Sequence, residues 1–352
     1  MTQINKDKPV MVTGATGYVA GHLIKLLLEA GLTVHAPIRN PDDKGKTQYL
    51  DGLAEASKGK IVYFKADLLE NGSYDKAMEG CELVYHTASP FTMAVQDPVK
   101  DLIEPALLGT KNVLEAANRV TSVNRVVLTS SCAAIIGDTA DLLDLPNCTA
   151  TEEIWNESST EKHQPYSYSK TIAEKEAWKI NEAQSRWDLV TINPTLVLGP
   201  GINPNGTSES FNIFKQLGDG TMKAGVPNLD IGTVDVRDVA EAHYKAGFTA
   251  SAKGRHLVSA KSITLLEMAK ILDDHFGDAY PFPKKELPKF MVWLVGPFVG
   301  MPRKMVSRNI GYPWKVDNSK AKKELGIEFK QPEEYVVSFF QQLIDSGYFK
   351  AP

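Results

Sequence analysis

The feature that most restricts the fold of this 352-residue chain is a short apolar strand that runs directly into a glycine turn. Residues 10–12 are Val-Met-Val, and residues 13–21 read Thr-Gly-Ala-Thr-Gly-Tyr-Val-Ala-Gly. Leucine and isoleucine then recur with helical spacing as far as Gly31. A strand, a tight turn and a helix in this order predict a parallel α/β unit, in which the helix crosses back over the sheet.

The two glycines inside this turn have separate physical roles. Gly14 permits the tight turn, and Gly17 lets the backbone approach a pyrophosphate, which the free N–H groups and the positive dipole end of the helix stabilise. The third small residue of the dinucleotide-binding pattern is Ala20, followed by Gly21, so the strict three-glycine pattern is not met. The turn predicts a nucleotide site that contains Gly14, Thr16, Gly17, Tyr18 and Val19.

Strands and helical stretches alternate along the first 200 residues. The expected strands lie near residues 9–13, 33–38, 60–65, 82–86, 124–130 and 188–195. This alternation predicts the α/β class with a doubly wound parallel sheet, the Rossmann arrangement. The pattern changes after Pro200, and the chain is too long for a nucleotide domain alone. We therefore predict a Rossmann domain from residues 1–200 plus 228–258, and a smaller, mostly helical substrate-binding lobe from residues 201–227 plus 259–352.

Arg39 stands at the end of the second expected strand. A site for NAD normally has a carboxylate here to bind the adenosine ribose, whereas the 2′-phosphate of NADP needs a cation. Lys44 and Lys46 follow, although Asp42 and Asp43 dilute the local positive charge. The pattern favours NADP(H), with Arg39, Lys44 and Lys46 as cofactor residues. The alternative is a solvated Arg39 beside a site for NADH.

A tyrosine and a lysine four positions apart open a long helical stretch. On a helix such positions are surface neighbours, so Lys170 can lie close to Tyr166 and lower the pKa of the phenol. A second pair with the same spacing, Tyr280 and Lys284, has two prolines between its members, which exclude a helix. Tyr166 and Lys170 are therefore a candidate acid–base pair.

Several further motifs follow in a fixed order along the chain. They are Ala-Asp-Leu at 66–68, His-Thr-Ala-Ser-Pro-Phe at 86–91, Gly-Thr-Lys-Asn at 109–112, Leu-Thr-Ser-Ser at 128–131 and Asn-Pro-Thr-Leu-Val-Leu-Gly-Pro at 193–200. With the glycine turn, Arg39 and the Tyr166/Lys170 pair, the chain resembles the extended short-chain dehydrogenase/reductases. Within them it is similar to the dihydroflavonol reductases, cinnamoyl-CoA reductases and microbial aldehyde or ketone reductases. The resemblance covers nearly the whole chain.

This resemblance implies a Ser-Tyr-Lys mechanism. Ser131 would hydrogen-bond the substrate carbonyl, Tyr166 would donate the proton, and Lys170 would lower the tyrosine pKa and hold the nicotinamide ribose. Ser130 is the alternative to Ser131, because neighbouring residues of a strand point to opposite faces. Asp67 could instead be an ordinary turn residue. The implied cofactor residues beyond the glycine turn and its cations are Asp67, Leu68, Thr87, Ala88, Ser89, Thr129, Tyr166, Lys170, Pro194, Thr195 and Val197.

The substrate side of the site is expected to be apolar. Phe91, Ile136 and Phe211 are the candidate pocket residues, and they suit a small-molecule aldehyde or ketone with a hydrophobic group. Dihydroflavonol reductases carry Asn or Asp at the position of Ile136 to recognise a catechol ring, so catechol recognition is not implied. Cinnamoyl-CoA reductases have Asn-Trp-Tyr where this chain has Gln-Pro-Tyr at 164–166, so a CoA thioester is not implied either. The expected activity is NADPH-dependent reduction of a carbonyl to the alcohol.

Three other functions stay open at this point. An NAD-dependent hydroxysteroid dehydrogenase would share the fold but would prefer a carboxylate in place of Arg39. Sugar-nucleotide epimerases and dehydratases share the Tyr/Lys pair, but the dehydratases commonly place Asp-Glu near the catalytic serine, where this chain has Cys132 and Ala133. An NADPH-sensing module without catalysis would tend to lose Tyr166.

Composition excludes several classes of partner. The net charge is −4 with no basic cluster, which argues against nucleic acid or an anionic membrane. The chain has three cysteines without a Cys-x-x-Cys pair and seven scattered histidines, so neither a disulfide framework nor a metal site is expected. The first nine residues lack an apolar signal core. We expect a cytoplasmic monomer or homodimer.

The most apolar stretch of the sequence runs from residue 290 to residue 301. Gly296, Pro297 and Gly300 interrupt it, and it is too short to span a bilayer. Buried core is the favoured interpretation, with a lid helix or a dimer contact as alternatives.

Overall fold

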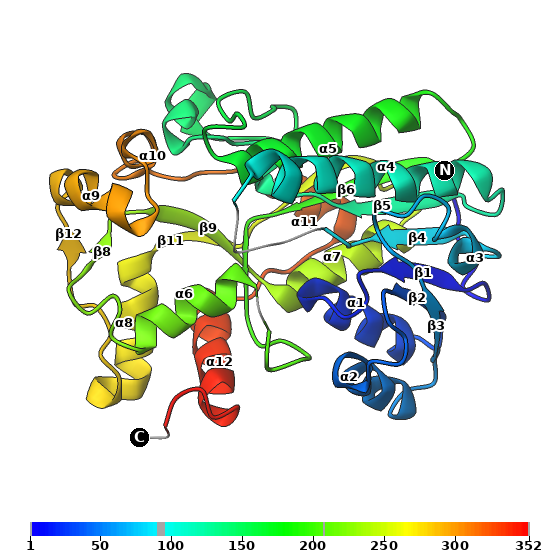
Figure 1. Ribbon diagram of the computed structural model, residues 1–352, viewed down its shortest axis with the longest axis horizontal. Coiled ribbons are helices and arrows are strands. Elements are labelled where there is room, and N and C mark those ends of the chain that lie inside the picture. Colours follow the sequence, from blue (N-terminus) through cyan, green and yellow to red (C-terminus); the bar gives the residue numbers. More distant parts are fainter. Residues whose placement is uncertain (1, 90–95, 207, 351–352) are drawn as a thin grey trace.

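A seven-stranded parallel sheet forms the centre of the protein, seen in the computed structural model of Figure 1, which describes residues 2–89, 96–206 and 208–350. Its strands, in spatial order, are β3 (Lys60–Lys65), β2 (Thr33–Ile38), β1 (Val10–Thr13), β4 (Leu83–His86), β5 (Arg125–Thr129), β6 (Asp188–Pro194) and β10 (Gly254–Val258). The order confirms the predicted doubly wound sheet. Because the strand order reverses between β1 and β4, a crevice opens there at the carboxyl ends of the strands.

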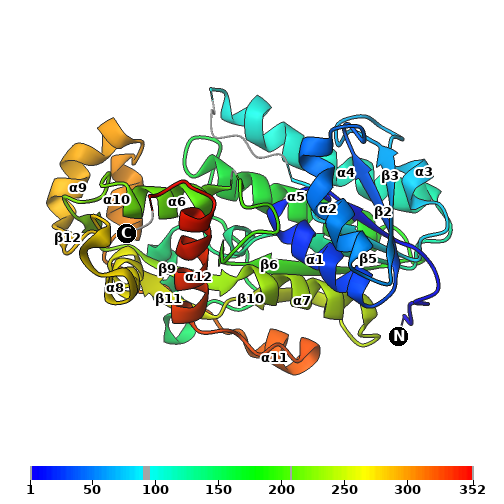
Figure 2. The ribbon, with the colours of Figure 1, turned by 90° about the horizontal axis from the view of Figure 1, so that it is seen from below.

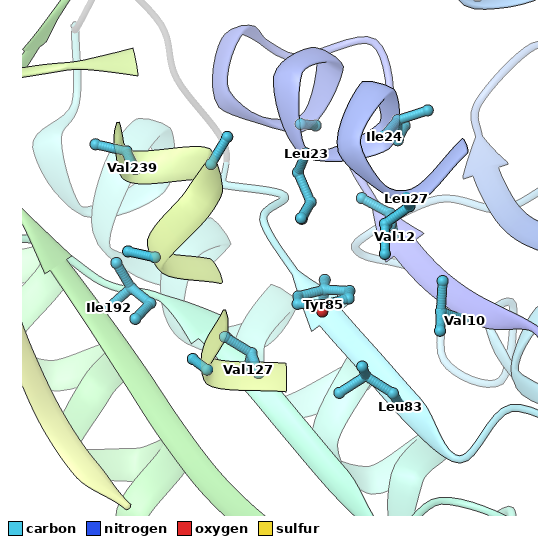
Figure 3. Packing of buried hydrophobic residues seen from close by; sticks show 14 of the residues in the cluster. Val10, Val12, Leu23, Ile24, Leu27, Leu83, Tyr85, Val127, Ile192 and Val239 are labelled. Atoms are coloured by element: carbon cyan, nitrogen blue, oxygen red, sulfur yellow. The ribbon is translucent and has the colours of Figure 1, made fainter. Parts of the chain in front are cut away.

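Helices cover both faces of this sheet. Those of the Rossmann region are α1 (Tyr18–Glu29), α2 (Lys44–Glu55), α3 (Asp75–Met78), α4 (Glu104–Arg119), α5 (Pro165–Glu182) and α7 (Val236–Phe248), with a π-helical turn η1 (Val99–Ile103) before α4. Val10 and Val12 of β1 pack with α1 and α7 on one face, as Figure 3 shows, whereas Met11 packs with α4 on the other. The alternation along β1 follows from the two-residue period of a strand.

The long connection from β5 to α5 contains three short 3₁₀ helices. They are η2 (Cys132–Ala134), η3 (Thr139–Asp144) and η4 (Pro146–Cys148). It ends at Gln164, whose φ of 54° is left-handed, and Pro165 then occupies the first turn of α5, where its missing N–H costs nothing. This turn delivers Tyr166 and Lys170 to the cleft side of the sheet.

The second lobe is mostly helical and carries two small sheets (Figure 2). One sheet contains β7 (Leu196–Leu198), β9 (Asp230–Asp235) and β11 (Lys261–Thr264), and the other pairs β8 (Val226–Pro227) with β12 (Glu286–Leu287). The helices are α6 (Glu209–Gly218), α8 (Leu265–Phe276), α9 (Lys289–Val295), α10 (Arg303–Asn309), α11 (Ser319–Leu325) and α12 (Pro332–Asp345), with 3₁₀ turns η5 (Gly277–Ala279) and η6 (Gly296–Val299). Phe214, Phe339 and Phe340 lie at the centre of its core.

Two elements lie across the predicted domain boundaries. β7 falls within residues 1–200 but pairs with β9 of the lobe sheet. α11 falls within residues 259–352, yet its Ala321 and Leu325 are buried in the core between α1, α7 and the Rossmann sheet. The lobe and the Rossmann region are therefore joined at two places, β7 and α11. The remaining domain boundaries stay predictions.

Candidate active site

The glycine turn leaves the N-terminus of α1 open toward the crevice between β1 and β4. Gly14 has a φ of +64°, and a Cβ there would lie 2.9 Å from the Cα of Ala88. A Cβ at Gly17 would lie 2.9 Å from the carbonyl oxygen of Gly14, which the Gly17 N–H hydrogen-bonds at 2.8 Å. Only glycine therefore fits either position. Thr13 fixes the neighbouring strand end, because its Oγ accepts from the N–H of Ala88 at 3.0 Å.

Most of the predicted cofactor residues line this crevice. It has a volume of about 580 Å³. The predicted residues on its walls are Gly14, Thr16, Gly17, Arg39, Asp67, Leu68, Thr87, Ala88 and Ser89. Asp67 also accepts from the N–H of Leu69 at 2.9 Å, so it forms the turn that was the alternative interpretation as well. The open helix end, the two glycines and the cation give the crevice the donors that a dinucleotide phosphate requires.

Arg39 is placed as a phosphate ligand would be. It lies on the crevice wall with Pro37 and Ile38 from the end of β2. No carboxylate lies within ion-pair distance of it in residues 2–89, 96–206 and 208–350. Because Arg39 stands at the end of β2 without an acidic partner, its guanidinium is free to make a bidentate contact to phosphate.

Four predicted cofactor side chains lie away from the crevice. The hydroxyl of Tyr18 donates to the carbonyl of Gly199, and its ring meets Phe211 edge-on at 5.5 Å. Val19 packs against the core beneath α1. Lys44 and Lys46 pair with Asp51 and Asp43 on α2, at 3.4 and 3.3 Å. All four stay predictions as cofactor residues, since Lys44 and Lys46 are exposed and Lys46 lines a neighbouring pocket together with Thr16, Gly17 and Tyr18.

Ser131, Tyr166 and Lys170 come together at the mouth of the crevice. The Ser131 side chain accepts from the N–H of Ala133 at 3.1 Å and lies close enough to the Tyr166 hydroxyl to lower its pKa. The Nζ of Lys170 lies 5.6 Å from the centre of the Tyr166 ring and donates to Ser89 at 2.7 Å. Strand alternation sends Ser130 the other way, where it donates to buried Glu174.

Contrary to the sequence prediction, Lys170 does not lower the pKa of Tyr166. Tyr166 is 41% exposed as a whole residue, yet burial around its hydroxyl raises its pKa to about 12, against a lowering effect of the Ser131 hydrogen bond. Burial also lowers the pKa of Lys170 to about 8. The group that lowers the phenol pKa here is thus Ser131 and not Lys170, because the lysine is itself desolvated and turned toward Ser89.

The remaining predicted cofactor residues lie at the carboxyl ends of β5 and β6. Thr129 hydrogen-bonds the Nε2 of His243 at 2.6 Å, and that histidine donates from Nδ1 to a carbonyl of α7. Burial lowers the pKa of His243 to about 4, so the ring is neutral. Pro194 ends β6, and the N–H of Thr195 donates to Val258 at 3.2 Å. Val197 follows in β7 and packs partly against the core.

The structure treats the three predicted substrate-pocket residues differently. Phe91 lies outside the described residues. Ile136 lines a cavity of about 590 Å³ between the segments 135–145 and 153–158. Phe211 is only 1% exposed, because its ring is held between Tyr18 and Phe339. The prediction for Phe211 is therefore wrong: it is an anchor between α1 and the lobe and presents no surface to a substrate.

Sequence reasoning missed a buried carboxylate directly behind the site. Glu174, one turn after Lys170 on α5, accepts hydrogen bonds from side chains of β6, β10 and the end of β5 as well as from α5 itself. The donors are Ser130, Trp178, Thr191, Asn193 and Arg255. Asn193 also donates to the carbonyl of Ser131 at 3.2 Å, so the network holds the end of β5 against α5. The helical spacing from Lys170 was the one signal in the sequence, because Arg255 is 81 residues away.

A second buried carboxylate, Asp138, lies in the connection between Ser131 and Tyr166. It accepts from His163 at 2.9 Å and from Gln164 at 2.6 Å, just before α5. Arg308 and Asn309 of α10 donate to it at 2.7 and 2.8 Å. Burial alone would raise the pKa of Asp138, but the hydrogen bonds from His163, Asn309 and Arg308 outweigh it and lower the pKa. Asp138 therefore joins the lobe to both ends of the catalytic segment.

Comparison with known proteins agrees with this geometry. The model of the NAD dependent epimerase/dehydratase family matches residues 10–258, which include the glycine turn, Ser131, Tyr166 and Lys170. The chain belongs to this family. It is 38% identical over 300 residues to a cinnamoyl-CoA reductase of Medicago truncatula, a match that covers 82% of this chain and 85% of the relative.

Two solved reductases of this fold superpose on nearly the whole chain. Gre2 from Candida albicans in complex with NADPH has a TM-score of 0.77 at 30% identity and covers 96% of this chain and 99% of its own. The yeast methylglyoxal/isovaleraldehyde reductase Gre2 complexed with NADPH has a TM-score of 0.76 at 28% identity, with 97% and 99% covered. The resemblance to the reductase group of the extended short-chain dehydrogenase/reductases is confirmed, and this member of the epimerase/dehydratase family is an oxidoreductase.

Proposed function

We propose that this protein reduces an aldehyde or ketone to the alcohol with NADPH, through Ser131, Tyr166 and Lys170. The observation that carries the proposal is their convergence at the crevice mouth, with Ser131 beside the Tyr166 hydroxyl and Lys170 donating to Ser89 on the crevice wall. NADPH, when bound, supplies the hydride that attacks the carbonyl carbon. The relatives' names support the class, since they are cinnamoyl-CoA, methylglyoxal and isovaleraldehyde reductases.

The chain's own residues would manage the carbonyl oxygen and its proton. Ser131 would donate a hydrogen bond to that oxygen and share its developing negative charge. Tyr166, which is protonated at neutral pH because burial keeps its pKa high, would transfer its proton to the same oxygen. Lys170 would bind the nicotinamide ribose hydroxyls beside Ser89 and, since it is charged at neutral pH with a pKa of about 8, would favour the phenolate left by proton transfer.

The choice of NADPH over NADH rests on Arg39. The family description names NAD, whereas both Gre2 structures hold NADPH. An unpaired guanidinium directly after β2 would bind a 2′-phosphate. The carboxylate Asp67 on the same crevice wall follows β3 and not β2, where a site for NAD normally has its acidic residue. The residues present therefore fit the phosphorylated nucleotide.

We propose an apolar carbonyl substrate of medium size. Ile136 and the adjoining Trp155 give the cavity beyond the catalytic serine an apolar wall. Its lining also carries the carboxylates Asp144, Glu153 and Glu157, which would repel the phosphates of a CoA ester. We also propose a cytoplasmic compartment, supported by three free cysteines, and a monomer or homodimer.

The experiment that tests the proposal compares Tyr166→Phe with Tyr168→Phe, a neighbouring tyrosine two positions along the same helix. Tyr166→Phe should keep NADPH affinity within about twofold and lose turnover by about 10²- to 10⁴-fold, because only proton donation is removed. Tyr168→Phe should retain both. NADPH binding is measured by calorimetry, and turnover by NADPH oxidation with a panel of alkyl and aryl aldehydes and ketones.

The same experiment separates the alternatives. A sensor of NADPH would show no turnover in the wild type, and an epimerase or dehydratase would turn over a sugar nucleotide without net oxidation of NADPH. Arg39→Glu should reverse the nucleotide preference toward NADH. An unchanged preference in Arg39→Glu would remove the basis for NADPH.

A further inference from the structure

A cluster of exposed apolar side chains lies on α9 and η6, at one end of the long axis of the molecule (Figure 1). Of the thirteen large hydrophobic side chains exposed among the described residues, seven lie within residues 290–299. We call this surface the apolar knob. Its members are Phe290, Met291, Trp293, Leu294, Val295, Phe298 and Val299. The expectation that residues 290–301 form buried core is therefore wrong, and Phe298 is 88% exposed.

The knob is the outer face of a well-packed helical hairpin. The inner face of α9 buries Val292 against Val306 and Ile310, in a small core of its own. A Cβ at Gly296 would lie 2.7 Å from the carbonyl oxygen of Met301, and the N–H of Met301 donates to Gly296 at 2.8 Å. Because the inward face is already satisfied, the outward apolar side chains have no place in the core. Soluble monomers rarely expose so continuous an apolar surface unless it binds something.

Exposed cations surround the knob. They are Lys285, Lys289, Arg303 and Lys304. The Arg303 guanidinium lies 4.4 Å from the centre of the Trp293 ring, and the Nζ of Lys289 lies 4.6 Å from that of Tyr312. Within the described part of the chain, none of these four cations forms an ion pair with a carboxylate. In a chain with a net charge of −4, residues 285–304 thus carry four exposed cations and one exposed carboxylate, Glu286, next to the most apolar surface.

We propose that the knob docks on the surface of a bilayer that contains anionic phospholipids. Aromatic and aliphatic side chains would enter the boundary between headgroups and acyl chains, and the four cations would bind headgroup phosphates. α9 has seven residues, and no helix among the described residues is long and apolar enough to cross a membrane, so the contact is shallow. The net charge of the whole chain, which argued against a membrane, does not describe this end of the molecule.

Charge favours a bilayer over a second copy of the chain. In a two-fold symmetric dimer the same patch meets itself, so two knobs in contact would bring eight like charges together around one apolar interface. A phosphatidylserine surface presents the opposite charge instead. The proposal is independent of the proposed function, since no residue of the knob lines the crevice or contacts the catalytic trio.

The test measures co-sedimentation with vesicles of phosphatidylcholine alone and of phosphatidylcholine mixed with phosphatidylserine. The wild type should bind the mixed vesicles and should bind less as salt rises. The double variant Phe290→Ser/Phe298→Ser should bind at least about tenfold more weakly, because two phenyl groups no longer leave water. Leu108→Ser, which removes an exposed leucine from α4, should bind like the wild type and serves as the matched control.

Two further measurements test the role of the cations and the insertion of Trp293 into the bilayer. Lys289→Glu should weaken binding to the mixed vesicles by about fivefold or more while leaving binding to phosphatidylcholine alone unchanged. Tryptophan emission should shift to shorter wavelength on binding, and the shift should disappear in Trp293→Phe, which shows that Trp293 is the residue that enters the bilayer.

Three results would overturn the proposal. One is no sedimentation of the wild type with mixed vesicles. Another is a wild-type dimer that the double phenylalanine variant converts to a monomer by light scattering, without vesicle binding, which would make the knob a dimer contact. The third is a rise in the KM for the carbonyl in the double variant without vesicles, which would make the knob a lid over the substrate. In each case the carbonyl reductase assignment is tested separately by Tyr166→Phe.

Discussion

Two charged side chains, Lys170 and Glu174, lie one helical turn apart on α5 and are compensated in opposite ways. The described part of the chain gives Lys170 a single hydrogen bond, to Ser89, and burial lowers its pKa to about 8. Glu174 instead accepts from a guanidinium and four neutral side chains. The Lys170 ammonium therefore keeps N–H donors without a partner among the described residues, whereas the Glu174 carboxylate has its hydrogen bonds satisfied.

The difference shows which of the two groups has a ligand still to bind. A saturated carboxylate can only hold the helix, whereas an under-compensated ammonium retains two N–H donors for ribose hydroxyls at the crevice wall. The desolvation of Lys170 lowers the free energy of unfolding, as often happens where a binding site requires a buried charge. Variants at Lys170, Glu174 and Asp138 test this difference between the two charges.

Lys170→Met should have the largest effect on activity and the opposite effect on stability. Turnover should fall by about 10²- to 10⁴-fold, because the ribose contact and the charge beside the phenolate are lost. The free energy of unfolding at neutral pH should rise, because a desolvated ammonium is removed. It is measured by urea denaturation across a pH series.

The pH dependence has a definite sign. The folded pKa of Lys170 lies below the unfolded value of about 10.4, so its destabilising effect is full below about pH 8 and disappears above about pH 10. The stability gain of Lys170→Met should shrink over that interval. Lys179→Met, at an exposed position of the same helix, should show no such change; a gain that is flat with pH would contradict the contrast.

Glu174→Gln should lower the free energy of unfolding by about 3–5 kcal/mol, because Arg255 then becomes a buried charge without its partner. The double variant Glu174→Gln/Arg255→Met should be less destabilised than Glu174→Gln, since no unpaired charge remains. The free energies of unfolding of the two variants are compared by chemical denaturation. Equal losses would mean that the ion pair is not what holds α5.

Asp138→Asn should cost less, about 1–3 kcal/mol, because an amide retains some of the hydrogen bonds that the carboxylate accepts. The folded pKa of Asp138 is lowered, so its stabilisation is present above the unfolded carboxyl pKa of about 3.9 and is lost as the pH falls through the lower folded pKa. The variant should therefore show a shallower loss of stability in acid. Asp144→Asn, exposed on the same segment, should follow the wild type.

The sequence allowed the crevice to be predicted because its parts lie at strand ends. Gly14, Thr87 and Arg39 each follow a strand, and parallel strands bring their carboxyl ends to one edge. Glu174 with Arg255 and Asp138 with Arg308 could not be predicted in this way, because the partners are 81 and 170 residues apart and meet only through packing.

Hydrophobicity alone also failed to separate inward from outward faces. Phe211 was expected at a pocket and is buried between α1 and α12, while Phe298 was expected in the core and is exposed. Which face of a short helix is covered depends on the neighbours that the fold supplies, and the sequence pattern of a seven-residue helix such as α9 does not specify them.

The hydrogen bonds from Arg308 and Asn309 of α10 to Asp138 connect two parts of the protein that are far apart in the sequence. α10 also carries Val306, against which α9 packs, so the hairpin at the far tip of the lobe and the chain between Ser131 and Tyr166 share a single rigid connection. A displacement of the α9–α10 hairpin would therefore act on the segment between Ser131 and Tyr166 through the contacts of Arg308 and Asn309 with Asp138.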